Sequence, residues 1–210
     1  MKYLFSLLFC WSCLAIPVTA AAEPIGVISV AVGAVQWWRD GETTRLERGD
    51  AVQEGDRVTT GAQARLVLSM NDGSRITLGG DSQMLFSQWR YRKQANDNSA
   101  QLELLEGAFR FITGLITDQS QPQLSVTTPD ATIGIRGTDF WGGYLQAGVL
   151  DVVLLEGDHA LQVNNNAGSV LIQHSGEGVS VRAGQQPDAA KRWSPEKIER
   201  AVATVRLPER

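Results

Sequence analysis

Residues 126–140, VTTPDATIGIRGTDF, carry the clearest signal for an all-β protein. Pro129 fixes its own φ and favours an extended conformation at Thr128, so a turn is predicted there. In residues 131–136 apolar residues alternate with polar or small ones, which is the pattern of a half-buried strand. Gly137 follows this strand, and a glycine here indicates either a positive φ or a close backbone approach.

Arg136 is an unusual residue to find between two glycines in a predicted strand. Its guanidinium carries five donors in a rigid fork and can bind several carbonyls or a carboxylate at once. Alternation alone would direct the side chain outward, but a bend at Gly137 would let it fold back as an internal clamp. The clamp would hold turn carbonyls or a carboxylate such as Asp56, Asp139 or Glu156. Contact with an external anion or partner is the alternative.

Short strands separated by glycine and aspartate turns are predicted along most of the chain. Residues 64–70 and 75–78 alternate around an Asn-Asp-Gly-Ser turn, which is typical of a hairpin. The continuous apolar run 149–155 indicates a strand buried on both faces. A Leu-Leu-Glu-Gly core at residues 104–107 recurs at 154–157, which suits coils of a solenoid or two halves of one architecture. We therefore expect an all-β fold with many short strands, either a solenoid-like roll or a sandwich.

The end of the chain has a helical pattern instead. Ser194 followed by Pro195 indicates an N-cap and first helical position, with Glu196 in the first turn. One face of the predicted helix is apolar and contains Ile198, Ala201, Val202 and Val205. The expected organisation is an all-β domain over residues 23–187 and a helical tail over residues 188–210.

Residues 1–22 are predicted to be a secretory signal peptide. Lys2 precedes an apolar run, Pro17 ends it, and small residues allow cleavage after Ala20 or Ala22. An uncleaved anchor is the alternative, because the apolar run is nearly long enough to span a membrane. No second long apolar run follows, so we expect no transmembrane helix after cleavage and a periplasmic or secreted protein.

The inventory of reactive residues is poor. Cys10 and Cys13 both lie in the predicted signal peptide, which leaves no thiol or disulfide afterwards. His159 and His174 have no partner at metal-ligand spacing, and no nucleophile elbow, phosphate loop or calcium loop occurs. A formal net charge of −4 gives no electrostatic footprint for nucleic acid. We expect a protein that is not an enzyme, with no catalytic residue, metal or cofactor.

Several motifs together resemble the FecR-type periplasmic domain family. The central segment matches the family signature at Thr128, Pro129, Arg136, Gly137, Thr138 and Phe140. An earlier turn motif matches it at Gly49, Asp50, Gly55 and Asp56. An Asp-Gly-Ser turn at residues 72–74 and an Ala-Gly-Gln segment at 183–185 complete the order, so the similarity covers residues 26–186.

The resemblance implies an exported, non-catalytic module that binds another envelope protein, in signal sensing or envelope assembly. The best-known members carry a cytoplasmic anti-sigma segment before a transmembrane helix. Only two residues precede the apolar run here, so no such segment is expected and sigma-factor control is not carried over. The partner would be recruited at an exposed strand edge or loop surface.

Glycan or peptidoglycan binding is the alternative function, because exposed tryptophans stack on sugar rings. The candidates are Trp37, Trp38, Trp89 and Trp141. Adjacent residues of a strand point to opposite faces, so at least one of Trp37 and Trp38 is expected to lie outside and form the platform.

Overall fold

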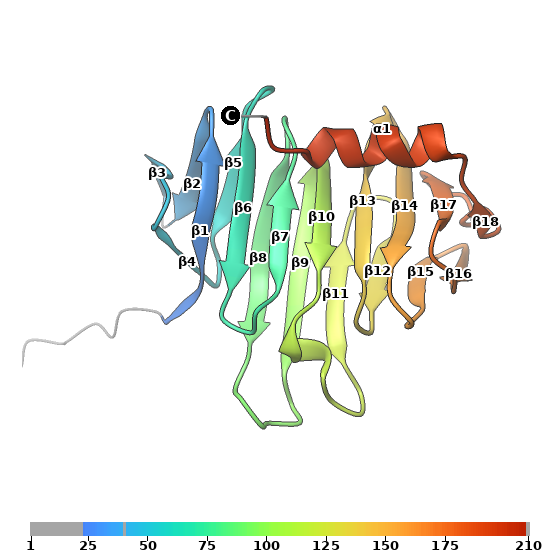
Figure 1. Cartoon of the computed structure of the whole chain (residues 1–210), viewed down its shortest axis with the longest axis horizontal. Coiled ribbons are helices and arrows are strands. Elements are labelled where there is room, and N and C mark those ends of the chain that lie inside the picture. Colours follow the sequence, from blue (N-terminus) through green and yellow to red (C-terminus); the bar gives the residue numbers. More distant parts are fainter. Residues whose placement is uncertain (1–22, 40, 209–210) are drawn as a thin grey trace, which may run out of the picture.

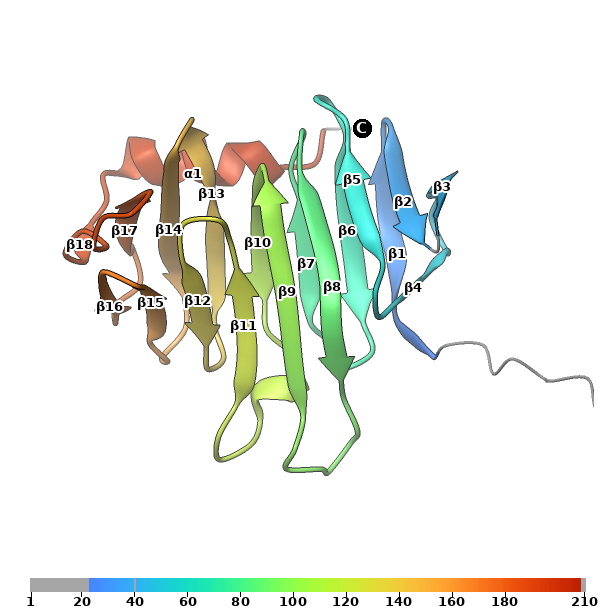
Figure 2. The same cartoon turned by 180° about the vertical axis from the view of Figure 1, so that it is seen from behind.

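The computed structural model describes residues 23–39 and 41–208 and shows a sandwich of two large β-sheets. The predicted signal peptide, residues 1–22, lies outside the described residues. Sheet A is in front in Figure 1, and sheet B is in front in Figure 2. The all-β prediction is confirmed, and of the two forms expected the sandwich fits.

Each sheet contains nine strands. Sheet A has the order β18 (Lys191–Arg192), β17 (Glu177–Arg182), β14 (Val149–Glu156), β13 (Asp139–Gln146), β10 (Ala108–Ile112), β7 (Arg75–Leu78), β6 (Arg65–Met70), β1 (Pro24–Val32) and β4 (Ala51–Gln53). Sheet B has the order β16 (Gly168–Ile172), β15 (Leu161–Asn165), β12 (Thr132–Ile135), β11 (Gln123–Thr127), β9 (Ser99–Glu106), β8 (Gln83–Arg90), β5 (Arg57–Thr60), β2 (Val35–Arg39) and β3 (Glu42–Arg45).

The chain passes back and forth between the two sheets after every one or two strands. The spatial order therefore nearly follows the sequence, and the colours in Figure 1 change steadily from one end of the sandwich to the other. Both Leu-Glu-Gly repeats stand at such crossings, one between β9 and β10 and the other between β14 and β15. The repeat seen in the sequence thus marks corners where the chain changes sheets.

Apolar side chains fill the space between the sheets. Ile133 and Ile135 of β12 are buried in this core, as their alternation predicted. The run over β14 is buried on both faces as well. Val152 packs in the main core, while Val153 packs on the outer face of sheet A against Trp141, in a second apolar cluster.

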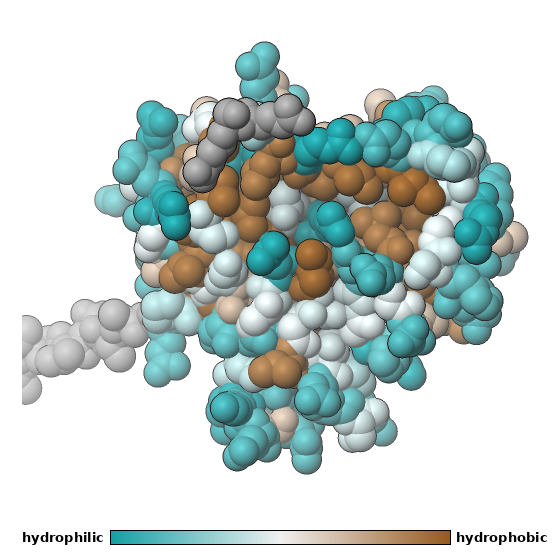
Figure 3. Space-filling model, viewed as in Figure 1, coloured by the Kyte–Doolittle hydropathy of each residue, from teal (hydrophilic) through white to brown (hydrophobic). Residues whose placement is uncertain are grey.

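Helix α1 (Pro195–Val205) covers that second cluster and confirms the predicted C-terminal helix. Ser194 is its N-cap, with a side-chain oxygen that accepts a hydrogen bond from the backbone N–H of Lys197 at 3.3 Å. Ala201 and Val205 are buried against sheet A. Figure 3 shows α1 as a polar ridge with apolar surface directly beneath it. The short 3-10 helix η1 (Leu115–Thr117) connects β10 to β11 and buries Ile116.

Candidate functional site

The Thr128–Pro129 part of the central motif forms the turn between β11 and β12. The Thr128 hydroxyl donates to the carbonyl of Ala131 at 2.9 Å and accepts hydrogen bonds from the N–H groups of Asp130 and Ala131. Asp130 in turn accepts a hydrogen bond from the Tyr144 hydroxyl at 2.8 Å. Burial, and this bond to Asp130, raise the pKa of Tyr144. These residues hold a turn and bind it to the neighbouring sheet.

The Arg136–Gly137–Thr138 part forms the corner where the chain leaves sheet B for sheet A. Gly137 has φ +114°, a conformation that residues with a side chain rarely adopt. The Thr138 N–H donates to Oγ1 of Thr113 at 2.6 Å, and its hydroxyl donates to the carbonyl of Glu156 at 2.8 Å. One residue therefore joins the ends of β10 and β14 to the start of β13. Phe140 then lies fully buried, packed against two other phenylalanines.

Arg136 does not form the internal clamp in this structure. Its side chain is exposed, and within the described residues it makes no hydrogen bond or ion pair. The alternation of β12 continues into Arg136 and directs it outward, because the bend at Gly137 comes one residue too late to return it. Asp139, one expected partner, binds Arg110 instead at 2.5 and 2.9 Å, and these hydrogen bonds raise the pKa of Arg110.

A true clamp of the predicted kind stands elsewhere, at the earlier turn motif. Asp56 is fully buried and accepts two hydrogen bonds from the Arg39 guanidinium, at 2.5 and 2.6 Å. It also accepts one from the backbone N–H of Gln53 at 2.8 Å. Gly55, at φ +90°, makes the turn that brings the carboxylate there.

The other half of that motif is a surface turn. Gly49 has φ +98°, and the Asp50 carboxylate accepts a hydrogen bond from the Glu47 N–H at 2.7 Å. Local backbone geometry therefore explains Gly49 and Asp50, whereas Asp56 is explained by its ion pair with Arg39.

A wide groove with a volume of about 1100 Å³ lies on the outer face of sheet B. One row of paired residues crosses six strands along it. From β8 to β16 the row is Gln88, Gln101, Ser125, Gly134, Gln162 and Leu171. Amides, a hydroxyl and a glycine dominate this floor, and none of the six residues is charged.

The middle of the groove is open because Gly134, which lines it there, has no side chain. A Cβ placed on it would lie 3.8 Å from the nearest atoms, both in Gln162, which is ordinary contact. The backbone therefore does not require glycine here, and the missing side chain leaves space on the outer face. The alternation of β12 predicts that Gly134 faces outward, but only the pairing of β12 with its neighbours shows the groove.

Arg136 stands at the rim of this groove together with Asp158 and His159. The same arginine and histidine also line a second hollow of about 520 Å³ next to η1. Arg136 is thus an exposed cation between two depressions, a position suited to an external carboxylate or other anion. Contact with an external anion or partner is the alternative that the sequence indicated for Arg136.

The two neighbouring tryptophans point to opposite faces of β2, as expected. Trp37 is half-buried against the core, with the Arg39 guanidinium 3.5 Å from its ring centre. Trp38 is 46% exposed on the outer face of sheet B, with Arg57 5.7 Å from its ring. Trp89 and Trp141 are buried and can offer no platform.

No group of three or more His, Cys, Asp or Glu side chains in the described ranges could hold a metal ion. Over the same residues, no helix combines the length and apolar character needed to cross a membrane.

The chain resembles solved structures in fold. Two crystal structures of a "putative anti-sigma factor" from Parabacteroides distasonis ATCC 8503, at 1.65 and 2.50 Å resolution, align with a TM-score of 0.53 and 14% identity. Each alignment covers 68% of this chain and 62% of the other, so the chain spans less than two thirds of that protein's length. No curated protein is significantly similar in sequence.

Fold and motif together define a β-sandwich module whose signature residues hold turns and corners. The family whose model matches is described as FecR protein, over residues 56–158. The predicted resemblance to the FecR family is confirmed over this segment, which makes up just under half of the chain.

Proposed function

We propose that this protein is an exported, non-catalytic FecR-type module that binds a protein partner in the periplasm or envelope, in signal sensing or envelope assembly. The observation that carries the proposal is the open groove of about 1100 Å³ on the outer face of sheet B. The other motif residues of the central segment hold turns, a corner and the core, whereas Arg136 is exposed at the rim of this groove.

The chemistry of the groove suits an extended polypeptide. Gln101, Gln162 and Ser125 offer both donors and acceptors, as a peptide backbone requires. Arg136 at the rim offers a planar fork for a carboxylate of the partner, from an acidic side chain or a chain terminus. Binding of this kind places one charged contact at the end of a neutral polar floor.

Site-specific crosslinking in cells tests the proposal. A photo-crosslinking residue in place of Gln101 should capture one defined partner, and Arg136→Ala in the same protein should reduce that product at least tenfold. The same residue in place of Arg75, which is exposed on sheet A, is the matched control. Equal capture from both positions, or from the Arg75 position alone, would refute the groove as the binding surface.

Glycan binding is the second candidate, because Trp38 lies exposed on the same outer face. Cross-strand pairs lead from Trp38 through Arg57 and Leu85 to Glu103, so it shares the face with the groove. If Trp38 is a platform, Trp38→Ala should abolish retention on peptidoglycan or polysaccharide and leave the melting temperature unchanged. Retention that survives this substitution, or is absent from the wild type, would leave protein binding as the function.

A further inference from the structure

Strand β16 (Gly168–Ile172) is a free edge of sheet B with an unusual composition. Residues 160–173, which form the hairpin of β15 and β16, include no charged residue. Val170 is half-buried and Leu171 is 51% exposed. Free edges usually carry charges, prolines or bulges that prevent pairing with another strand. This edge carries none of them.

The hairpin geometry shows which backbone groups of β16 are open. Only two residues separate Asn165 from Gly168, so this closing pair must exchange the hydrogen bonds of the hairpin. Alternation then gives the inward bonds to Gly168, Val170 and Ile172. The N–H and C=O groups of Ser169 and Leu171 point away from β15. Within the described part of the chain these four groups have no backbone partner.

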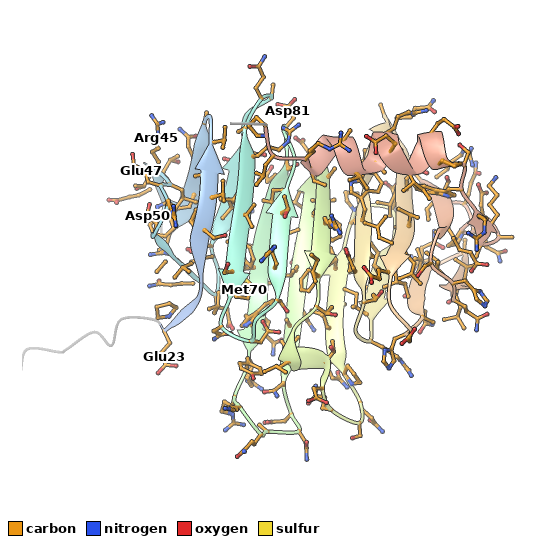
Figure 4. All side chains as sticks on the ribbon, in the orientation of Figure 1. Glu23, Arg45, Glu47, Asp50, Met70 and Asp81 are labelled. Carbon is orange, nitrogen blue, oxygen red and sulfur yellow. The ribbon has the colours of Figure 1, made fainter. Side chains whose placement is uncertain are left out.

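The three other sheet edges differ from β16. The opposite edge of sheet B is β3, which carries Glu42 and Arg45, and Figure 4 shows Arg45, Glu47 and Asp50 projecting from that end of the sandwich. In sheet A, β18 has only two residues, both basic, and β4 has only three. These edges are short or charged, as protected edges are.

We propose that β16 pairs with β16 of a second copy of this chain, antiparallel across a two-fold axis at Val170. In this register the open backbone groups of Ser169 face those of Leu171 in the other copy. The open groups of Leu171 likewise face those of Ser169 in the other copy. Four backbone hydrogen bonds form, and the two B sheets become continuous. If the two-fold axis lay at Ser169 or at Leu171 instead, only that residue would direct its open backbone groups at its own copy. Fewer backbone hydrogen bonds would then form between the two β16 strands.

The side chains fit the same register. Leu171 lies beside the small Ser169 of the other copy on the outer face, and Ile172 lies opposite Gly168 on the inner face. Val170 meets its own copy at the axis. A large residue thus stands against a small one on the outer face, whereas on the inner face the Gln186 side chain already fills the space beside Gly168.

The absence of charge favours a second copy over a different partner. A different partner can supply opposite charges, so a charged edge would serve it well. When a strand pairs with its own copy about a two-fold axis, each charged residue lies close to the same residue of the other chain. Like charges on paired strands repel each other and destabilise the pairing. A neutral hairpin is therefore the composition that self-pairing requires.

The dimer would also extend the groove described above. Ser169 and Leu171 line one end of it, so the two grooves would meet at the axis and form one longer surface. The dimer itself rests on the edge and stands or falls independently of the proposed function.

Sedimentation equilibrium of the exported domain tests the pairing. The wild type should show a reversible monomer–dimer equilibrium. Leu171→Pro removes an outward N–H that β15 does not use, so the monomer should fold normally, while the dimer dissociation constant should rise at least a hundredfold. Thr43→Pro, on the charged edge β3, is the matched control and should leave the equilibrium unchanged. A monomeric wild type, or a dimer that survives Leu171→Pro, would overturn the proposal.

A charge exchange tests the register. Ser169→Glu and Leu171→Lys should each weaken the dimer several-fold, because each introduces two like charges near the axis. An equimolar mixture should recover dimers, since position 169 of one chain faces position 171 of the other. Circular dichroism checks that each variant is folded. If each single variant dimerises weakly and the mixture does not restore dimer formation, this register is refuted. If the edge binds only an extended peptide of another protein, self-pairing is refuted.

Discussion

Two arginines give opposite predictions for stability. Asp56 is fully buried and takes both hydrogen bonds of the Arg39 fork, whereas Arg136 is exposed and unpaired within the described residues. Asp56→Ala would leave the Arg39 guanidinium and the Gln53 N–H without their acceptor. Breaking a buried ion pair from one side costs about 3–5 kcal/mol.

The lower end of that range applies here, because the Arg39 side chain is 26% exposed and water can solvate it. A loss of about 3 kcal/mol corresponds to a fall in melting temperature of roughly 6–12 °C for a domain of this size. Arg39→Lys should lose about half as much, since an ammonium keeps the charge but lacks the fork. Arg136→Ala should stay within about 0.5 kcal/mol of the wild type, as surface substitutions usually do.

Thermal melts of the three variants and the wild type decide the matter. Far-UV circular dichroism at low temperature controls for loss of fold. A fall for Arg136→Ala as large as that for Asp56→Ala would refute the assignment, and would mean that Arg136 is a clamp in solution. Equal melting of all four proteins would show that neither arginine stabilises the fold measurably.

Three further predictions follow from other parts of the molecule. Gly134→Leu should fill the groove floor and reduce partner crosslinking at least tenfold, with the melting temperature unchanged or slightly raised, because glycine weakens a strand interior. Ser194→Ala should lower the free energy of unfolding by about 1 kcal/mol through loss of the N-cap of α1, measured by urea denaturation. The exported chain should begin at Ala21 or Glu23, as determined by N-terminal sequencing. A chain that still begins at Met1 would favour the membrane anchor.

Much of the fold could be predicted from local patterns. The alternation around Ile133, the buried run of β14 and the cap at Ser194 are each decided by neighbours in sequence, and the structure agrees with them. The Asp56 clamp could not be predicted, because Arg39 reaches that carboxylate only through the pairing of β2 with β5. The outward direction of Arg136, by contrast, follows from the alternation of β12 itself, and the clamp depended on a bend before that residue which the structure does not have.

The groove was beyond sequence reasoning too. Gln101, Ser125, Gly134 and Gln162 are ordinary outward-facing residues when each strand is considered alone. Their alignment in one row depends on the registers of four strands, including the parallel pairing of β9 with β11. One signal was present in the sequence, the uncharged stretch 160–173, and it marks the end of that row.

Helix α1 has a consequence for how the whole sandwich unfolds. Because each strand pairs mainly with strands close in sequence, a protein of this layout could open from one end, strand by strand. The helix runs back across sheet A, however, and forms side-chain hydrogen bonds with two of its strands. Lys197 donates to Asp151 of β14, and Thr204 accepts from the indole N–H of Trp141 in β13. The backbone carbonyl of Arg206, just beyond it, accepts a hydrogen bond from Arg65 of β6. The last residues of the chain thereby make early and late strands unfold together, and deleting them should convert one cooperative transition into separate, broader ones.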